Sequence, residues 1–120
     1  MGDSISFDGV RMAVSVTGDK GVVGTGTRIR FIQRGSRVLG CYSGGRIIRG
    51  FLVGELSGAV LTFRFAQVET TQGRGSALHA GHSRCEVCRS NRGTIQVIEH
   101  FSWTTRDGMG TNVFDEVLAP

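Results

Sequence analysis

The chain has 120 residues, 39% of them hydrophobic and 20% charged, which predicts one domain with its own core. It lacks the ~18 consecutive apolar residues of a membrane span and the basic and apolar regions of a signal peptide. Three cysteines are too few for a disulfide framework. We therefore expect a cytoplasmic protein that does not enter a membrane.

Short stretches of alternating apolar and polar residues recur along the chain, roughly every ten residues, as in all-β proteins. Residues 1–10 precede them and are expected to be flexible, to add a short strand or to form a plug. The predicted strands are residues 11–17, 27–33, 37–43, 46–54, 59–70, 76–89, 94–104 and 111–117. No segment shows a sustained helical period, so little or no helix is expected.

Glycine lies in nearly every gap between these strands, and the single proline is the terminal Pro120. Glycine suits tight hairpin turns, and a closed strand ladder excludes proline from its interior. The pattern predicts one all-β domain over residues 1–120, an eight-stranded antiparallel up-and-down β-barrel. A barrel of about eight strands is either filled by its own side chains or holds one small ligand.

One carboxylate interrupts the apolar side of the seventh predicted strand. Glu99 shares that side with Val97, Phe101 and Trp103, because alternate residues of a strand face the same way. A buried carboxyl needs a partner, and a histidine or arginine across the sheet is expected. Burial would also raise its pKa, so Glu99 is the candidate catalytic acid or base.

The other candidate pocket residues are polar or amphipathic and lie in predicted strands. Two opposite faces of the fifth strand are candidates, because Gln67 shares a side with Phe63 and Phe65 whereas Arg64 lies on the other. The sequence leaves open which face points inward. The expected ligand-binding residues are Tyr42, Arg64, Gln67, Cys85 and Trp103.

Four residues of types that bind zinc follow each other at intervals of three: His79, His82, Cys85 and Cys88. On a regular strand such residues alternate between faces, and His79 and Cys85 would lie roughly 20 Å apart. A single site could form only if this segment is a loop. We therefore expect no metal, with the four-ligand site as the alternative.

The chain carries 14 Lys and Arg against 10 Asp and Glu, a net charge of +4. Arg28, Arg30, Arg34 and Arg37 fall around one predicted hairpin. No aromatic residues interleave with them as a nucleic-acid stacking platform needs. A solvated strand face is therefore expected, and nucleic-acid binding is not.

Several segments resemble a family of small bacterial proteins often labelled "N-acetylglutamate synthase". They are residues 40–47 with Gly50, residues 61–65, Cys85, residues 99–104 and Gly110, within residues 24–116. The resemblance implies a calycin-like barrel similar to lipocalins and streptavidin, with Arg64, Cys85, Glu99 and Trp103 at family positions. The label does not suit an all-β chain, because such an acetyltransferase needs a helix-bearing α/β domain.

These observations predict a protein that binds an unknown small organic molecule in a polar-centred pocket, without a cofactor. One alternative is a small cyclase, isomerase or lyase that uses Glu99 as acid or base. Another is an interaction protein that uses its basic surface. Apolar neighbours such as Ile47 with Ile48 leave hydrophobic residues on both faces of a strand, so a homodimer is expected.

Overall fold

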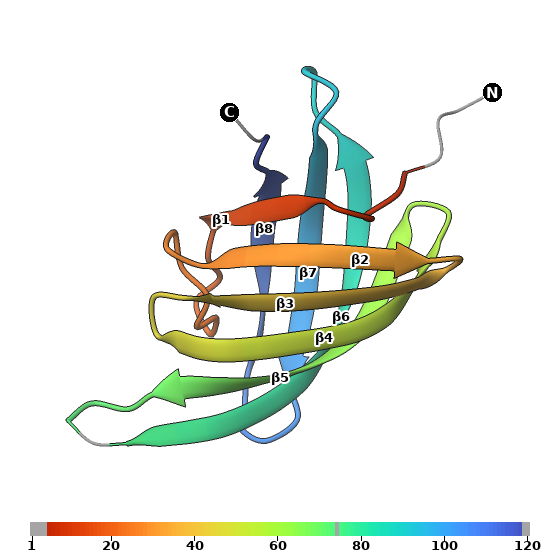
Figure 1. Cartoon of the computed structure of the whole chain (residues 1–120). Coiled ribbons are helices and arrows are strands. Elements are labelled where there is room, and N and C mark those ends of the chain that lie inside the picture. Colours follow the sequence, from red (N-terminus) through yellow and green to blue (C-terminus); the bar gives the residue numbers. More distant parts are fainter. Residues whose placement is uncertain (1–4, 74, 119–120) are drawn as a thin grey trace.

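The computed structural model describes residues 5–73 and 75–118. Its eight strands form a closed barrel in which each strand pairs antiparallel with the next and β1 pairs with β8 (Figure 1). They are β1 (Arg11–Val16), β2 (Arg28–Arg34), β3 (Arg37–Gly44), β4 (Ile47–Ser57), β5 (Val60–Thr70), β6 (Ser76–Arg89), β7 (Ile95–Trp103) and β8 (Met109–Glu116). The predicted eight-stranded antiparallel barrel is confirmed.

The largest difference in strand bounds concerns β4. The sequence predicts an end at Gly54, whereas the strand continues to Ser57 through pairs such as Leu56 with Leu61. Gly54 lies within the ladder, where a Cβ would overlap the backbone of Thr62. This glycine therefore allows close approach of two strands, and the turn follows at Gly58, whose φ is 59°.

A bulge near the start of β4 corrects the predicted faces of that strand. Simple alternation places Ile47, Arg49, Phe51 and Val53 on one side. The register shifts between Ile47 and Arg49, so Ile47 is buried while Phe51 and Val53 are exposed. An extra residue on one strand reverses the phase of everything beyond it.

The two ends of the barrel differ in how they are covered. Residues 5–10 form no strand but close the end where β2 meets β3, which we call the plugged end. Phe7 is completely buried there, its ring centroid 5.0 Å from that of Phe31. Backbone hydrogen bonds from Gly9 to Phe31 and from Phe31 to Val10 hold the segment in place.

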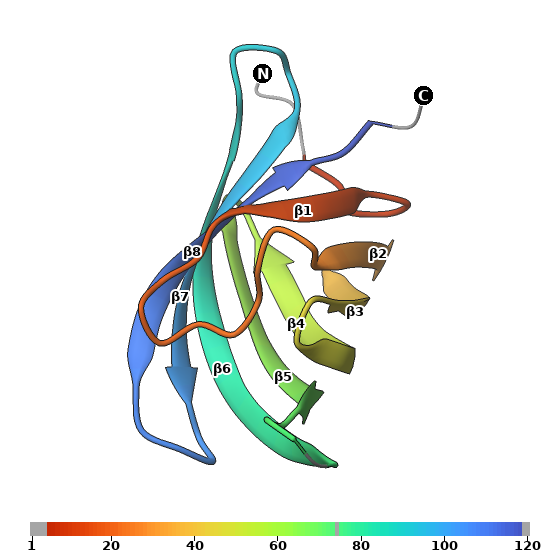
Figure 2. The same ribbon diagram turned by 90° about the vertical axis from the view of Figure 1, so that its left-hand side faces the viewer.

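The opposite end carries the longer connections and is called the loop end. Residues 17–27 join β1 to β2 as a long loop, orange in Figure 2, and residues 104–108 join β7 to β8. Strands β3, β5, β6 and β7 each carry polar side chains at the strand end that lies at the loop end of the barrel. No helix in the described residues is long and apolar enough to cross a membrane.

Candidate functional site

A small cavity lies inside the barrel toward the loop end. Its walls include Phe65, Phe101 and Trp103, and its polar lining consists of Tyr42, Gln67, Glu99 and Asn112. The cavity volume is about 30 Å³. With its present covering the cavity has room for water rather than for a larger ligand.

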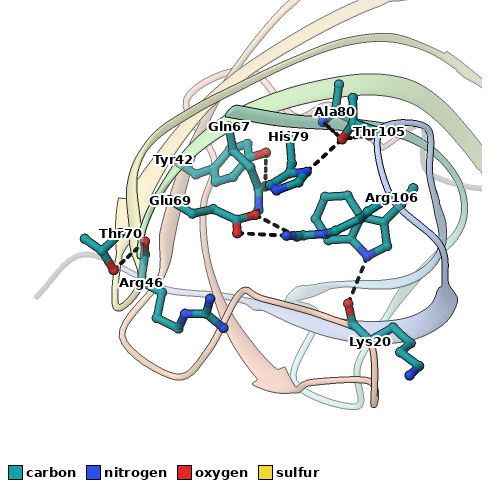
Figure 3. A network of polar contacts seen from close by, with 11 residues as sticks. Lys20, Tyr42, Arg46, Gln67, Glu69, Thr70, His79, Ala80, Thr105 and Arg106 are labelled. Carbon is teal, nitrogen blue, oxygen red and sulfur yellow. Dashed lines mark hydrogen bonds and ion pairs between the residues drawn. The ribbon is translucent and has the colours of Figure 1, made fainter. Parts of the chain in front are cut away.

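A chain of buried hydrogen bonds leads from this cavity to the loop end (Figure 3). The Tyr42 hydroxyl donates to Gln67 Oε1 at 2.7 Å, and Gln67 Nε2 donates to Glu69 Oε2 at 2.8 Å. Alternation along β5 places Gln67 and Glu69 on the inner face. Gly50 lies directly across from Tyr42, and its missing side chain leaves space for the tyrosine ring.

Arg106 ends this chain from the loop between β7 and β8. Its two terminal nitrogens donate to Glu69 Oε1 and Oε2 at 3.0 and 2.7 Å, a two-pronged pairing that suits a planar guanidinium. Its guanidinium carbon also lies 3.7 Å from the centre of the Trp103 ring. Burial alone would raise the pKa of Glu69, but hydrogen bonds from Arg106 and Gln67 and the arginine charge lower it overall.

The loop between β1 and β2 covers the cavity. Its residues Val22 and Val23 line the wall. Trp103 Nε1 donates to the Lys20 carbonyl at 2.9 Å, and the Gly18 amide donates to Asn112 Oδ1 at 2.9 Å. Two cavity-lining side chains, Trp103 and Asn112, therefore hold the loop that covers the cavity.

Glu99 lies deeper and has neutral partners. Ser83 Oγ donates to its Oε2 at 2.6 Å and Asn112 Nδ2 donates to its Oε1 at 2.9 Å. Burial raises the pKa of Glu99, and these two hydrogen bonds offset only part of that effect. The prediction of an arginine or histidine partner for Glu99 is therefore wrong. The buried carboxylate that pairs with an arginine is Glu69, and its partner is Arg106.

The five predicted ligand-binding residues divide between the cavity and other places. Tyr42, Gln67 and Trp103 line the cavity. Cys85 is fully buried and is the direct cross-strand partner of Glu99, but it is not part of the cavity wall. Burial raises the pKa of its thiol, which makes it a core residue of low nucleophilicity.

Arg64 corrects the sequence-based prediction of the pocket. Phe63 and Phe65 point into the barrel, so Arg64 between them points outward and is exposed. The sequence left open which face of β5 points inward, and the aromatic residues decide it. Burying two phenylalanines is favourable, whereas burying an unpaired arginine is costly.

The four candidate zinc ligands are not brought together. They lie on β6, which is continuous from Ser76 to Arg89, with His82 and Cys88 on its exposed face and Cys85 buried. His79 instead contacts the β7–β8 loop, where its Nδ1 lies 2.9 Å from Thr105 Oγ1. Within residues 5–73 and 75–118, no group of three or more His, Cys, Asp or Glu could hold a metal ion.

Three residues of the site were missed by sequence reasoning. Glu69 carried a usable signal, since it lies two residues after Gln67 on the same predicted strand. Asn112 also lies in a predicted strand, but nothing set it apart from other polar residues. Arg106 had no signal, because it lies in a predicted loop and meets Glu69 only through the closure of the barrel.

A closed eight-stranded barrel with a buried polar cavity at its loop end defines a calycin-like protein. The family model described as "Avidin-like protein" matches residues 5–117, nearly the whole chain. The chain therefore belongs to the avidin-like family, which agrees with the predicted streptavidin-like fold. No curated protein and no solved structure matches the chain.

Proposed function

We propose that this protein binds one small organic molecule in the cavity at the loop end of the barrel. The observation that carries the proposal is a set of hydrogen-bonding side chains placed among aromatic walls: Tyr42, Gln67, Glu99 and Asn112. Ligand sites in proteins combine apolar walls with a few oriented polar groups in this way. Membership of the avidin-like family supports the same class of function.

The charges of the site define the chemistry of the proposed ligand. The cavity wall contains no cationic side chain among the described residues, and the raised pKa of Glu99 favours its neutral form. The buried part of the ligand is therefore neutral and exchanges hydrogen bonds with amide, hydroxyl and carboxyl groups. Lys20, Arg46 and Arg106 lie around the loop end (Figure 3) and suit an anionic group at the outer end of the ligand.

Binding requires the covering loop to move, because the closed cavity is too small for an organic ligand. Val22 and Val23 would leave the wall, which breaks the contacts of Trp103 with Lys20 and of Asn112 with Gly18. Both broken contacts free polar groups inside the cavity. The ligand then takes over these hydrogen bonds, which offsets the cost of opening.

Trp103 provides the test, since it is the only tryptophan of the chain and lines the cavity. Its fluorescence is titrated with biotin and with neutral cyclic amides and cyclic ureas of similar size. Native mass spectrometry of the same samples reports the stoichiometry. We expect one bound molecule and a change in Trp103 emission for at least one probe or for a molecule that is retained on purification.

Two variants on the same strand control this experiment. Gln67→Leu keeps a similar volume but removes the bond to Tyr42, and binding is expected to weaken by about tenfold or more. Arg64→Ala changes an outward residue and leaves binding unchanged. The proposal is wrong if neither a probe nor a retained molecule occupies the protein. It is also wrong if Gln67→Leu binds as tightly as Arg64→Ala and the unmodified protein.

A second candidate is proton transfer to a bound molecule, because the raised pKa of Glu99 makes it a proton donor inside the cavity. Glu99→Gln distinguishes the two functions. A protein that only binds keeps most of its affinity, since glutamine can still bond to Ser83 and Asn112. An enzyme loses turnover of the bound molecule while it still binds.

A further inference from the structure

Large hydrophobic side chains are exposed on the outer face of β2, β3 and β4, which lie side by side in Figure 1. Ile32, Phe51 and Val53 are each more than half exposed, at 55%, 56% and 52%, and Leu39 is 39% exposed. Leu39 is the direct cross-strand partner of both Ile32 and Val53, and half-buried Cys41 is the partner of Phe51. These five residues form one continuous patch, which we call the apolar face.

Arginines surround the apolar face. The strand register places Arg11 and Arg30 toward β1, Arg34 and Arg37 at the turn between β2 and β3, Arg28 and Arg49 toward the loop end, and Arg64 on β5 beside Val53. All of these arginines are exposed, and we call them the arginine rim. Two acidic residues lie among them, Asp8 and Glu55, so positive charge predominates around the apolar face.

Two pairs within the arginine rim place like charges directly opposite each other. Arg11 is the cross-strand partner of Arg30, and Arg34 is the partner of Arg37. Like charges in that position destabilise a sheet. No arginine of the rim takes part in an ion pair among residues 5–73 and 75–118. The fold therefore gains nothing from these charges, and an anion outside the chain would balance them.

The chemistry of this surface narrows the class of partner. A chain that adds as an extra strand is excluded, because all eight strands are paired on both sides and leave no free edge. A nucleic acid would contact the arginine rim through its phosphates but would leave Phe51 and Val53 without an apolar partner. The matching partner carries several anionic groups around an apolar region, as the surface of an anionic lipid bilayer does.

The spread of the arginine rim favours a bilayer over a single amphiphilic molecule. The two like-charged pairs lie four residues apart along β2, a distance of about 14 Å at ~3.4 Å a residue. One headgroup cannot contact both pairs, whereas neighbouring headgroups of a bilayer can. A hollow of about 750 Å³, which residues 8–11 share with the apolar face, reaches Arg11 and Arg30 but not the other pair. A single molecule bound there would therefore leave Arg34 and Arg37 unmatched.

We propose that the apolar face and the arginine rim together dock this protein on the surface of an anionic lipid bilayer. Phe51 and its apolar neighbours enter the boundary between headgroups and acyl chains. The arginines contact the lipid phosphates, while their aliphatic stems cover apolar surface. The contact lies on the outside of β2, β3 and β4, separate from the cavity in the barrel interior, so it does not depend on the proposed ligand.

Co-sedimentation of the full chain with vesicles tests the proposal. Binding is expected to vesicles of phosphatidylcholine and phosphatidylglycerol in equal parts, to weaken with added salt, and to be nearly absent with phosphatidylcholine alone. Arg30→Gln/Arg34→Gln should weaken binding by about tenfold or more, because each arginine near the surface contributes roughly fivefold. Phe51→Ser should weaken it by about fivefold or more. Phe51→Trp adds a fluorophore that brominated lipids should quench, whereas Trp103 of the unmodified protein should not be quenched.

Arg84→Gln and Met109→Ser are the matched controls, because both residues are exposed on other strands, β6 and β8; neither change should alter binding. Circular dichroism confirms that each variant is folded. The proposal is overturned if anionic vesicles are not bound, if neutral vesicles are bound equally well, or if the controls weaken binding as much as the test variants. Saturable binding of a monomeric short-chain phosphatidylglycerol would assign the hollow to one lipid and would also overturn it. So would a free protein that sedimentation velocity shows to be a dimer and that Phe51→Ser makes monomeric.

Discussion

The two halves of the barrel are made by the same strands but have opposite interiors. The plugged half contains Met12, Val38, Leu61 and Val97, all buried and apolar, under the Phe7 plug. The half toward the loops contains every buried polar or charged side chain of the described residues: Thr27, Gln67, Glu69, Ser83, Glu99 and Asn112.

This contrast separates the closely packed core from the proposed binding site along the barrel axis. The apolar half excludes water and makes closely packed contacts, which stabilise the fold without offering a ligand anything specific. The polar half contains the cavity, and none of its buried side-chain polar atoms in the described residues lacks a hydrogen-bond partner. Its partners are mostly each other, so a ligand can replace them.

The largest effect is expected in the apolar half. Leu61 is completely buried on β5, and Leu61→Ala should lower the free energy of unfolding by about 2–5 kcal/mol because it leaves a cavity. Urea denaturation measures this. Ligand binding by the folded fraction should be unchanged, and a specific loss of binding would contradict the division into two halves.

A smaller loss of stability is expected when the ion pair at the loop end of the polar half is broken. Arg106→Ala leaves the buried Glu69 without its cationic partner and should cost about 1–3 kcal/mol. Arg106→Lys should be intermediate, because lysine keeps the charge but not the two-pronged bond. Trp103 emission should change in both variants, since Arg106 packs on its ring.

The pH dependence of this pair provides a second measurement. The lowered pKa of Glu69 stabilises the fold above the ordinary glutamate pKa of about 4.3, and this stabilisation disappears as the pH falls through the lowered value. Arg106→Ala should therefore lose less stability on acidification than the unmodified protein. Equal losses would mean that the pair does not couple to folding.

Glu99 is expected to have the opposite pH dependence. Its pKa is raised in the folded protein, so the unfolded chain releases the proton first and stability falls as the pH rises above about 4.3. Glu99→Gln removes this loss, and its melting temperature should exceed that of the unmodified protein more at pH 7 than at pH 4. A constant difference across this range would show that Glu99 has an ordinary pKa.

The smallest effect is expected outside both halves. Arg64→Ala changes an exposed side chain without an ion pair in the described structure and should alter stability by no more than about 0.5 kcal/mol. Thermal melts check this. A larger loss would mean that the outer surface of β5 contributes to the fold in a way its exposure does not indicate.

Much of the barrel was predictable because strands are recognised from local patterns. The bounds of β6 were predicted to the residue, and the positive φ angles of the described residues all fall on glycines, including Gly35 and Gly93 at predicted turns. Tyr42, Glu99 and Trp103 were expected in the interior because each shares a strand face with apolar residues or carries a large ring, and all three line the cavity.

The sequence by itself therefore determined the strands, their order and the composition of each face, because alternation is a property of neighbouring residues. The tertiary structure decided which face of β5 points inward, where β4 bulges, and that Arg106 meets Glu69, 37 residues away. Those outcomes depend on how the strands are staggered when the sheet closes. That stagger follows from the packing of the whole interior, which no single segment specifies.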